Sequence, residues 1–212
     1  MAKQQLSVDE TVAMLDAVAD AIIAAEPELS EADRNLGDGD HGLGMKRGME
    51  AVKAKLSEGS FESVDKVFMA MGMAMMSSMG GASGAVFGTL FRNGGKALKG
   101  SETFDAAGLA EFLKGGTEGV MSRGGAKPGD KTMVDALEPA QKAAESAVSL
   151  PLSEALDTTA QAAEAGRDAS KDLIATMGRA KTLGEASIGH PDAGACSVAI
   201  IFRTMATFAA GN

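Results

Sequence analysis

Three aspartates gather in a stretch of the chain that is otherwise rich in glycine. Asp33 precedes the segment 35-NLGDGDHGLG-44, which contains Asp38 and Asp40. Carboxylates this close repel one another unless a cation lies between them, and carboxylate oxygens are the ligands that Mg²⁺ and Ca²⁺ prefer. Three acids could serve two Mg²⁺ ions, which also accept water and substrate phosphates as ligands. The alternative is a solvated acidic turn in which the glycines supply positive φ.

The spacing in this segment argues against three familiar motifs. An EF-hand that began at Asp38 would need glycine and glutamate where Leu43 and Met49 stand. A literal G-x-G-x-x-G spans residues 37–42, but no strand pattern precedes it and acids fill the positions where a pyrophosphate would lie. Residues 94–97 contain Gly-Gly-Lys without the earlier glycine or the Ser/Thr of a P-loop.

A second glycine-rich segment, residues 78–84, directly precedes an expected helix. Small residues at the start of a helix leave backbone N–H groups accessible at its positive end, which is a general anion-binding arrangement. Ser83 adds a hydroxyl donor. The alternative is close packing of helices at small residues.

Two later segments, 123–132 and 178–194, combine glycine with basic and polar side chains. Asp130 is expected to cap the following helix. Arg179 could stabilise developing negative charge, and Ala82 and Met133 could face a base. The basic residues that could neutralise phosphate are Arg123, Lys127, Lys131, Arg179 and Lys181, and both histidines, His41 and His190, lie in glycine-rich segments. Together these features are what a nucleotide with Mg²⁺ requires when there is no P-loop.

The elements that must position these segments are expected to be helices. Ala, Leu, Met, Glu and Lys dominate the long segments, and the alternation typical of strands is missing. Ser7 and Glu10 form a capping-box pattern before the first helix, which should continue to Pro27. Seven further helices are expected at residues 44–56, 61–79, 85–98, 105–122, 131–148 (with a kink at Pro139), 153–177 and 195–209.

Eight helices leave seven connections, and the glycine-rich ones are the first, third, fifth and seventh. Alternate connections of an up-and-down bundle lie at the same end. The sequence therefore predicts an all-α, eight-helix antiparallel up-and-down barrel or bundle with its functional site at one end. With 212 residues and no linker pattern, residues 1–212 are expected to form a single domain.

The composition of the chain indicates which classes of binding partner and which cellular compartment to expect. The net charge of −9 and the lack of a Lys/Arg-rich run argue against nucleic acid and anionic membranes as partners. We expect neither a signal peptide nor a membrane span, because the N-terminus is polar and no apolar run approaches 18 residues. The single cysteine, Cys196, fits a reducing cytoplasm and is expected in the core.

The four glycine-rich segments, taken in order, resemble those of a known family. They read GDGDHGLGMKRG (37–48), SSMGGASG (77–84), SRGGAKPGDKTM (122–133) and GRAKTLGEASIGHPDAGA (178–195). The combination resembles the nucleotide-binding (L) subunit of bacterial dihydroxyacetone kinase, and the resemblance spans nearly the whole chain. It departs from the family's frequent Asp-Pro-Gly at Asp192-Ala193-Gly194.

The resemblance implies an eight-helix barrel that binds ADP (or ATP) and two Mg²⁺ ions at one end. It implies that Asp33, Asp38 and Asp40 hold the metals and that Arg179 is catalytic. The implied nucleotide-binding residues are His41, Gly42, Leu43, Gly44, Ala82, Ser83, Gly124, Met133, Arg179, Asp192, Ala193 and Gly194. The triose would be held covalently by a partner K subunit, which explains why no nucleophile is evident in this chain.

The sequence is compatible with several alternatives. ADP could be a tightly held cofactor that a phosphotransferase-system protein rephosphorylates, or ATP could exchange as an ordinary substrate. Tetroses such as erythrulose could replace dihydroxyacetone, because substrate choice lies on the partner. A non-catalytic nucleotide-sensing module and a purely structural acidic bundle are the alternatives outside kinase chemistry.

Overall fold

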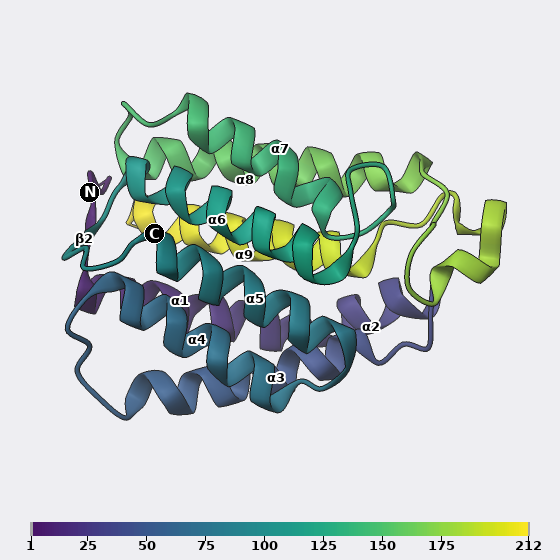
Figure 1. Ribbon diagram of the computed structural model, residues 1–212, viewed down its shortest axis with the longest axis horizontal. Helices are drawn as coiled ribbons and strands as arrows, with labels where there is room; N and C mark the ends of the chain where they lie inside the picture. Colours follow the sequence, from purple (N-terminus) through teal and green to yellow (C-terminus); the bar gives the residue numbers. More distant parts are fainter. Residues whose placement is uncertain (1, 212) are drawn as a thin grey trace.

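The computed structural model describes residues 2–211 and is mostly helical, as predicted. Helices follow one another along nearly the whole chain, interrupted by two very short strands (Figure 1). The elements are β1 (Leu6–Ser7), α1 (Val8–Ala24), α2 (Glu26–Arg34), α3 (His41–Ser57), α4 (Val64–Ser78), α5 (Gly81–Ala97), β2 (Thr103–Phe104), α6 (Ala106–Gly124), α7 (Val134–Ser146), α8 (Leu152–Ala169), η1 (Ser170–Asp172), η2 (Ala180–Ser187) and α9 (Ala193–Ala210).

The long helices pack side by side as an elongated bundle (Figure 1). From α3 to α9, each α-helix contacts the next one along the chain, and α1 contacts both α3 and α9. Both ends of the chain lie at one end of the bundle, whereas α2 and the segment containing η2 lie at the other. The helix faces that meet in the centre carry five fully buried phenylalanines, together with leucine, methionine and alanine.

The end of the bundle that carries the chain termini is closed by short-range structure. Ser7 caps α1 by accepting a hydrogen bond from the Glu10 amide, and the Glu10 carboxylate accepts one from the Ser7 amide, which confirms the capping box. The two strands, which the sequence did not predict, pair antiparallel and place Leu6 opposite Phe104. Both of these side chains are fully buried, so the strand pair covers this end of the core.

The prediction that one helix continues to Pro27 was wrong. Helix α1 ends at Ala24, and a separate helix, α2, begins at Glu26 with Pro27 in its first turn. Proline is tolerated there because first-turn N–H groups have no partner inside the helix. The restart matters for the site, because it places Asp33 on the last turn of α2 and not in a loop.

Other helix boundaries also differ from the prediction. Helices α3 and α5 begin at His41 and Gly81, earlier than the expected Gly44 and Ala85, so part of each glycine-rich segment forms the first turn of a helix. Helix α8 ends at Ala169, well before the expected Met177. Helix α7 continues through Pro139.

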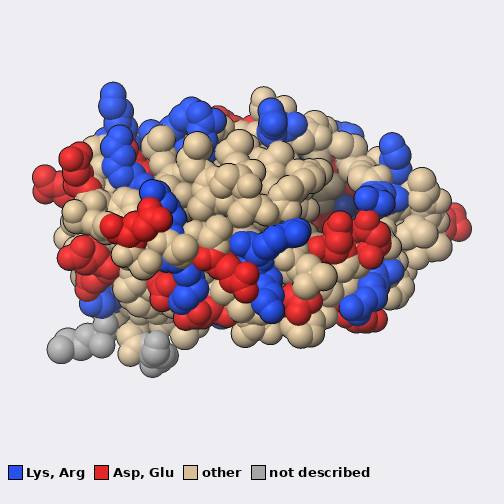
Figure 2. All heavy atoms as spheres, turned by 90° about the horizontal axis from the view of Figure 1, so that it is seen from below, with Lys and Arg blue, Asp and Glu red and all other residues tan. Residues whose placement is uncertain are grey.

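Helix α9 is long and apolar enough to cross a membrane by length and composition alone. It is mostly buried, however, and contacts α1, α2, α7 and α8. Its Arg203 pairs with Asp157 and Glu164 of α8 at 2.6 and 2.8 Å. These contacts identify α9 as the core helix of the bundle. On the face seen in Figure 2, acidic and basic side chains are interspersed over the surface.

Candidate functional site

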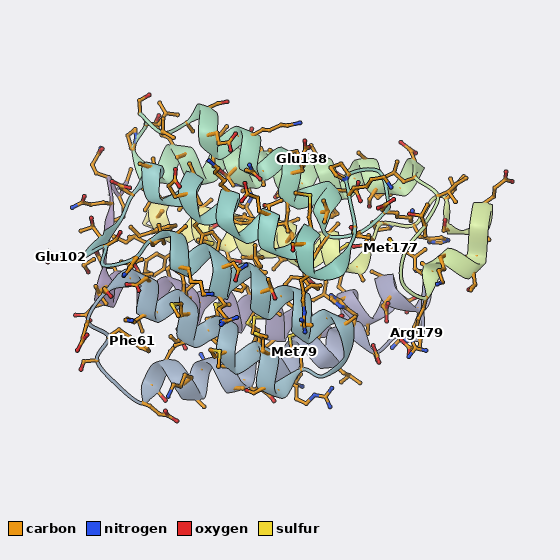
Figure 3. All side chains as sticks on the ribbon, in the orientation of Figure 1. Phe61, Met79, Glu102, Glu138, Met177 and Arg179 are labelled. Atoms are coloured by element: carbon orange, nitrogen blue, oxygen red, sulfur yellow. The ribbon has the colours of Figure 1, made fainter. Side chains whose placement is uncertain are left out.

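A cavity of about 620 Å³ opens at the end of the bundle that carries α2 and η2. All four glycine-rich segments contribute to its lining, as the alternation of connections predicted. Figure 3 shows Met177 and Arg179 on the segment that extends beyond the helix ends, and Met79 at the end of α4. The cavity therefore combines groups from segments that are far apart in the sequence.

The acidic wall of the cavity consists of Asp33, Asp38 and Asp40, which each offer a carboxylate oxygen within 4.8 Å of the others. Arg179 Nη2 lies 2.9 Å from Asp38 Oδ2 and is the cation paired with this cluster. Desolvation, and then the negative charges of Asp38 and Asp33, raise the pKa of Asp40. Among the residues that the structure describes, Arg179 is the one cation paired with these three hard oxygen donors, and such a donor set suits Mg²⁺.

Across the cavity, the first turn of α5 presents backbone amides. Gly80 precedes the helix with φ 73° and makes no side-chain cap, and a Cβ atom at Gly80 or Gly81 would meet no atom within 4 Å. The first N–H groups of a helix have no intrahelical partner. The open space before them and the positive end of the helix dipole therefore favour an anion such as phosphate.

His41 connects the acidic wall to the α5 terminus. Its backbone N–H donates to Asp33 Oδ2 (3.2 Å), while Nε2 lies 2.8 Å from Ser197 Oγ and Nδ1 lies 3.4 Å from Ser83 Oγ. The ring packs against Phe87, and burial lowers the pKa of His41. With both ring nitrogens near serine hydroxyls, the imidazole can orient Ser83 at the cavity wall.

An apolar wall completes the cavity. Its side chains come from α5, α6, the segment before α7 and the first residues of α7 and α9, and they are mostly buried. Such a surface suits the flat face of an aromatic base. This wall is formed by Val86, Phe87, Val120, Ala126, Met133, Val134 and Ala193.

Two aspartates order the segments beside this wall. Asp192 caps α9 by accepting a hydrogen bond from the Ala195 amide at 2.8 Å, and burial raises its pKa to about 7. The prediction that Asp130 caps a helix was wrong. Its carboxylate instead accepts bonds from the Lys127 amide and from Thr176 Oγ1, both at 2.8 Å. Asp130 thereby joins the fifth connection to the segment after α8.

Most of the residues predicted for the site line this cavity, although their roles stay predictions. Gly42 and Leu43 do not: Gly42 is packed tightly against α2, and the Leu43 side chain is exposed. His190 also lies outside the lining. The predicted residues on the cavity wall are Asp33, Asp38, Asp40, His41, Gly44, Ala82, Ser83, Gly124, Met133, Arg179, Asp192, Ala193 and Gly194.

Sequence reasoning missed part of the lining. Arg47 and Phe87 reach the cavity from one helical turn after Gly44 and Gly84, a position that the 3.6-residue period could have indicated. The sequence indicates Lys131 only as one of several basic residues, yet it is buried in the cavity wall. Ser197, on the second turn of α9, was not considered, because its partner is a histidine far away in the sequence.

Comparison of the sequence with known proteins found similar proteins that carry functional names. The ADP-binding subunit DhaL of PEP-dependent dihydroxyacetone kinase 1 from Listeria innocua is 44% identical over 177 residues, 84% of each chain. D-erythrulose kinase from Mycolicibacterium smegmatis is 39% identical over 197 residues, 90% of this chain but 34% of that longer one.

A solved structure has the same fold. The dihydroxyacetone kinase of C. freundii in complex with AMP-PNP and Mg²⁺ matches with a TM-score of 0.73 and 26% identity. The match covers 93% of this chain and 33% of the kinase chain. In addition, residues 35–207 match the DAK2 domain, a span that contains nearly all of the cavity lining. This chain belongs to the DAK2 domain family.

Proposed function

We propose that this chain is the ADP-binding subunit of a multisubunit dihydroxyacetone kinase. The observation that carries the proposal is the single cavity in which the three carboxylates face the open first turn of α5. This arrangement suits a nucleoside diphosphate accompanied by divalent metal, because the chain supplies both metal ligands and phosphate-binding amides. The Listeria relative, named as an ADP-binding subunit, supports the same function.

Asp33, Asp38 and Asp40 would hold two Mg²⁺ ions. The oxygen-only donor set and the excess negative charge of the cluster support this assignment. When bound, the metal would neutralise the charge of the phosphate oxygens. Arg179, paired with Asp38 at the rim of the cavity, is the proposed catalytic residue, since its guanidinium can swing from the carboxylate to a transferring phosphoryl group.

The chain's other residues would bind and orient the nucleotide. The amides of Gly81, Ala82 and Ser83 would donate to the phosphates, and the apolar wall that contains Met133 would contact the base. His41 would act by holding Ser83 and the Asp33 carboxylate in place. Gly44, Gly124, Asp192, Ala193 and Gly194 would complete the wall.

Dihydroxyacetone would be bound by a partner K subunit, and the phosphoryl group would come from a phosphotransferase-system protein. The name of the Listeria relative as a subunit of a PEP-dependent kinase supports this. We further propose that the chain is a single cytoplasmic domain and that the helices other than α2 form a closed antiparallel barrel, which the contacts of α1 with both α3 and α9 support.

A second candidate is an ATP-exchanging kinase subunit that acts on dihydroxyacetone or erythrulose. The similarity to D-erythrulose kinase and to a kinase solved with AMP-PNP favours it. A nucleotide-sensing module without transfer activity is the remaining non-enzymatic interpretation.

Native mass spectrometry of the purified chain, without added nucleotide, tests these proposals. An added mass of ADP with two Mg²⁺ is expected for a tightly held cofactor. A bare chain that gains nucleotide only with Mg-ATP would instead favour the exchanging enzyme. A bare chain under both conditions would refute the nucleotide site. Nucleotide binding without phosphoryl transfer, when a triose-loaded K subunit and its phosphoryl donor are added, would indicate a sensing module.

A further inference from the structure

Lys131 has an unusual backbone and an unusual environment. Among the described residues 2–211 it is the one non-glycine residue with positive φ, at 60°. Its side chain is nevertheless buried, with 2% of the residue exposed. A left-handed backbone is unfavourable for lysine, and an ammonium group is rarely buried without partners. Two unfavourable features at one position indicate that the surrounding structure depends on this side chain.

The ammonium group donates hydrogen bonds to two backbone carbonyls of another segment. Lys131 Nζ donates to Ser170 O at 2.6 Å and to Leu173 O at 3.1 Å. These carbonyls lie in and just after η1, where the chain leaves α8 and enters the long segment that leads to Arg179 and Asp192. The side chain therefore ties the fifth connection to the seventh.

Neighbouring bonds reinforce the same junction. Asp130 O accepts a hydrogen bond from the Thr176 amide at 3.2 Å, and Ser170 Oγ accepts one from the Asp192 amide at 3.0 Å. Burial lowers the pKa of Lys131, and the nearby Asp192, Asp135 and Asp172 act in the opposite direction. Lys131 and Asp192 both line the cavity, with Met133 beside them. The junction therefore forms one wall of the cavity.

We propose that Lys131 is a positioning residue that joins the 125–133 and 170–192 segments and thereby preforms the base side of the nucleotide cavity before ligand binds. This inference rests on the proposed function, because it assigns Lys131 to the same cavity. Loss of the ammonium group would weaken the junction, so the two segments would separate in more of the molecules, and part of the nucleotide's binding free energy would be spent on closing them. The apparent Kd should then rise in inverse proportion to the fraction of molecules that remain preformed.

The test compares Lys131→Met with wild type and with Lys171→Met in the full chain. Lys171 also lies at the junction, but its ammonium pairs with the exposed Asp168 and does not line the cavity. For Lys131→Met we expect the Kd of Mg-ADP by calorimetry to rise about tenfold or more, with the transfer rate at saturating nucleotide nearly unchanged. Lys171→Met should bind as wild type does. A Kd for Lys131→Met within twofold of wild type would refute the proposal.

A second variant, Lys131→Gly, distinguishes the effect of the ammonium group from that of the backbone conformation. Glycine relieves the positive φ but removes the ammonium, so binding should still weaken, and n-butylammonium should restore it where n-butanol does not. Undiminished binding by Lys131→Gly, or equal rescue by butanol, would mean that the ammonium does not matter. Failure of the wild-type chain to bind Mg-ADP would refute the proposed function, whereas wild-type binding with normal binding by both variants would refute only this inference.

Discussion

Replacing Asp40 with asparagine should stabilise the ligand-free protein while removing its response to Mg-ADP. Asp40 is the suitable target because Arg179 pairs with Asp38, so that ion pair survives the substitution. At 4.8 Å in a water-like dielectric, each carboxylate pair repels by about 0.9 kcal/mol. The Asp40→Asn substitution removes two such repulsions and weakens one attraction to Arg179, so the net gain should be about 1 kcal/mol.

Urea denaturation and thermal melts in EDTA would measure this gain, which corresponds to about 2–4 °C in Tm for a chain of this size. The gain should shrink in high salt, because exposed charges are screened. With Mg-ADP at about 100 times the wild-type Kd, wild type should gain about 2.7 kcal/mol and the variant almost none. Glu111→Gln, an exposed control on α6, should change neither quantity. A variant that is less stable in EDTA, or that keeps the full Mg-ADP response, would refute the proposed metal cluster.

Two further predictions concern glycine and pH. Gly42→Ala should destabilise the protein by about 2 kcal/mol and weaken Mg-ADP binding, because the new Cβ atom would lie 2.4 Å from Glu26 O and would push α3 away from α2. The control is Gly44→Ala, whose Cβ atom would meet no atom within 4 Å, and this variant should leave the ligand-free Tm unchanged or higher. Asp192, whose pKa is raised from 3.8 to about 7, favours folding while it is protonated, so ligand-free stability should fall as pH rises from about 4 to about 7, by at most about 4 kcal/mol in all, and then level off. Asp192→Asn should flatten this dependence, which urea denaturation at a series of pH values would measure.

The end of the bundle that carries the site could be predicted because its signals are local. Glycine-rich segments alternate with plain ones, and an up-and-down helical chain brings alternate connections together. That reasoning needed only the number of connections, and it survived the missed helix α2, which adds a bend before Asp33 without reversing the chain direction of the later helices. The capping box at Ser7 was predictable for the same reason, since both partners lie within one turn.

The parts that could not be predicted depend on contacts between distant segments. Lys131 carries no sequence mark that separates it from Lys127, yet one is buried on backbone carbonyls and the other is exposed. The expected cap at Asp130 failed because Thr176, far along the chain, provides a partner for its carboxylate. Ser197 was missed because its role exists only once α9 packs beside His41. Local patterns place such residues near the site but do not assign their partners.

The two ends of the bundle are stabilised in different ways, and the difference bears on function. The end with the chain termini is held by a capping box, a strand pair and fully buried apolar side chains. The cavity end concentrates mutually repelling carboxylates, a lysine in the left-handed region and an Asp192 carboxyl with a raised pKa. Metal and phosphate would relieve the repulsion there, so ligand binding and local stability are coupled. Release of the proposed ligands would restore the repulsion, so the proposed site would favour their retention.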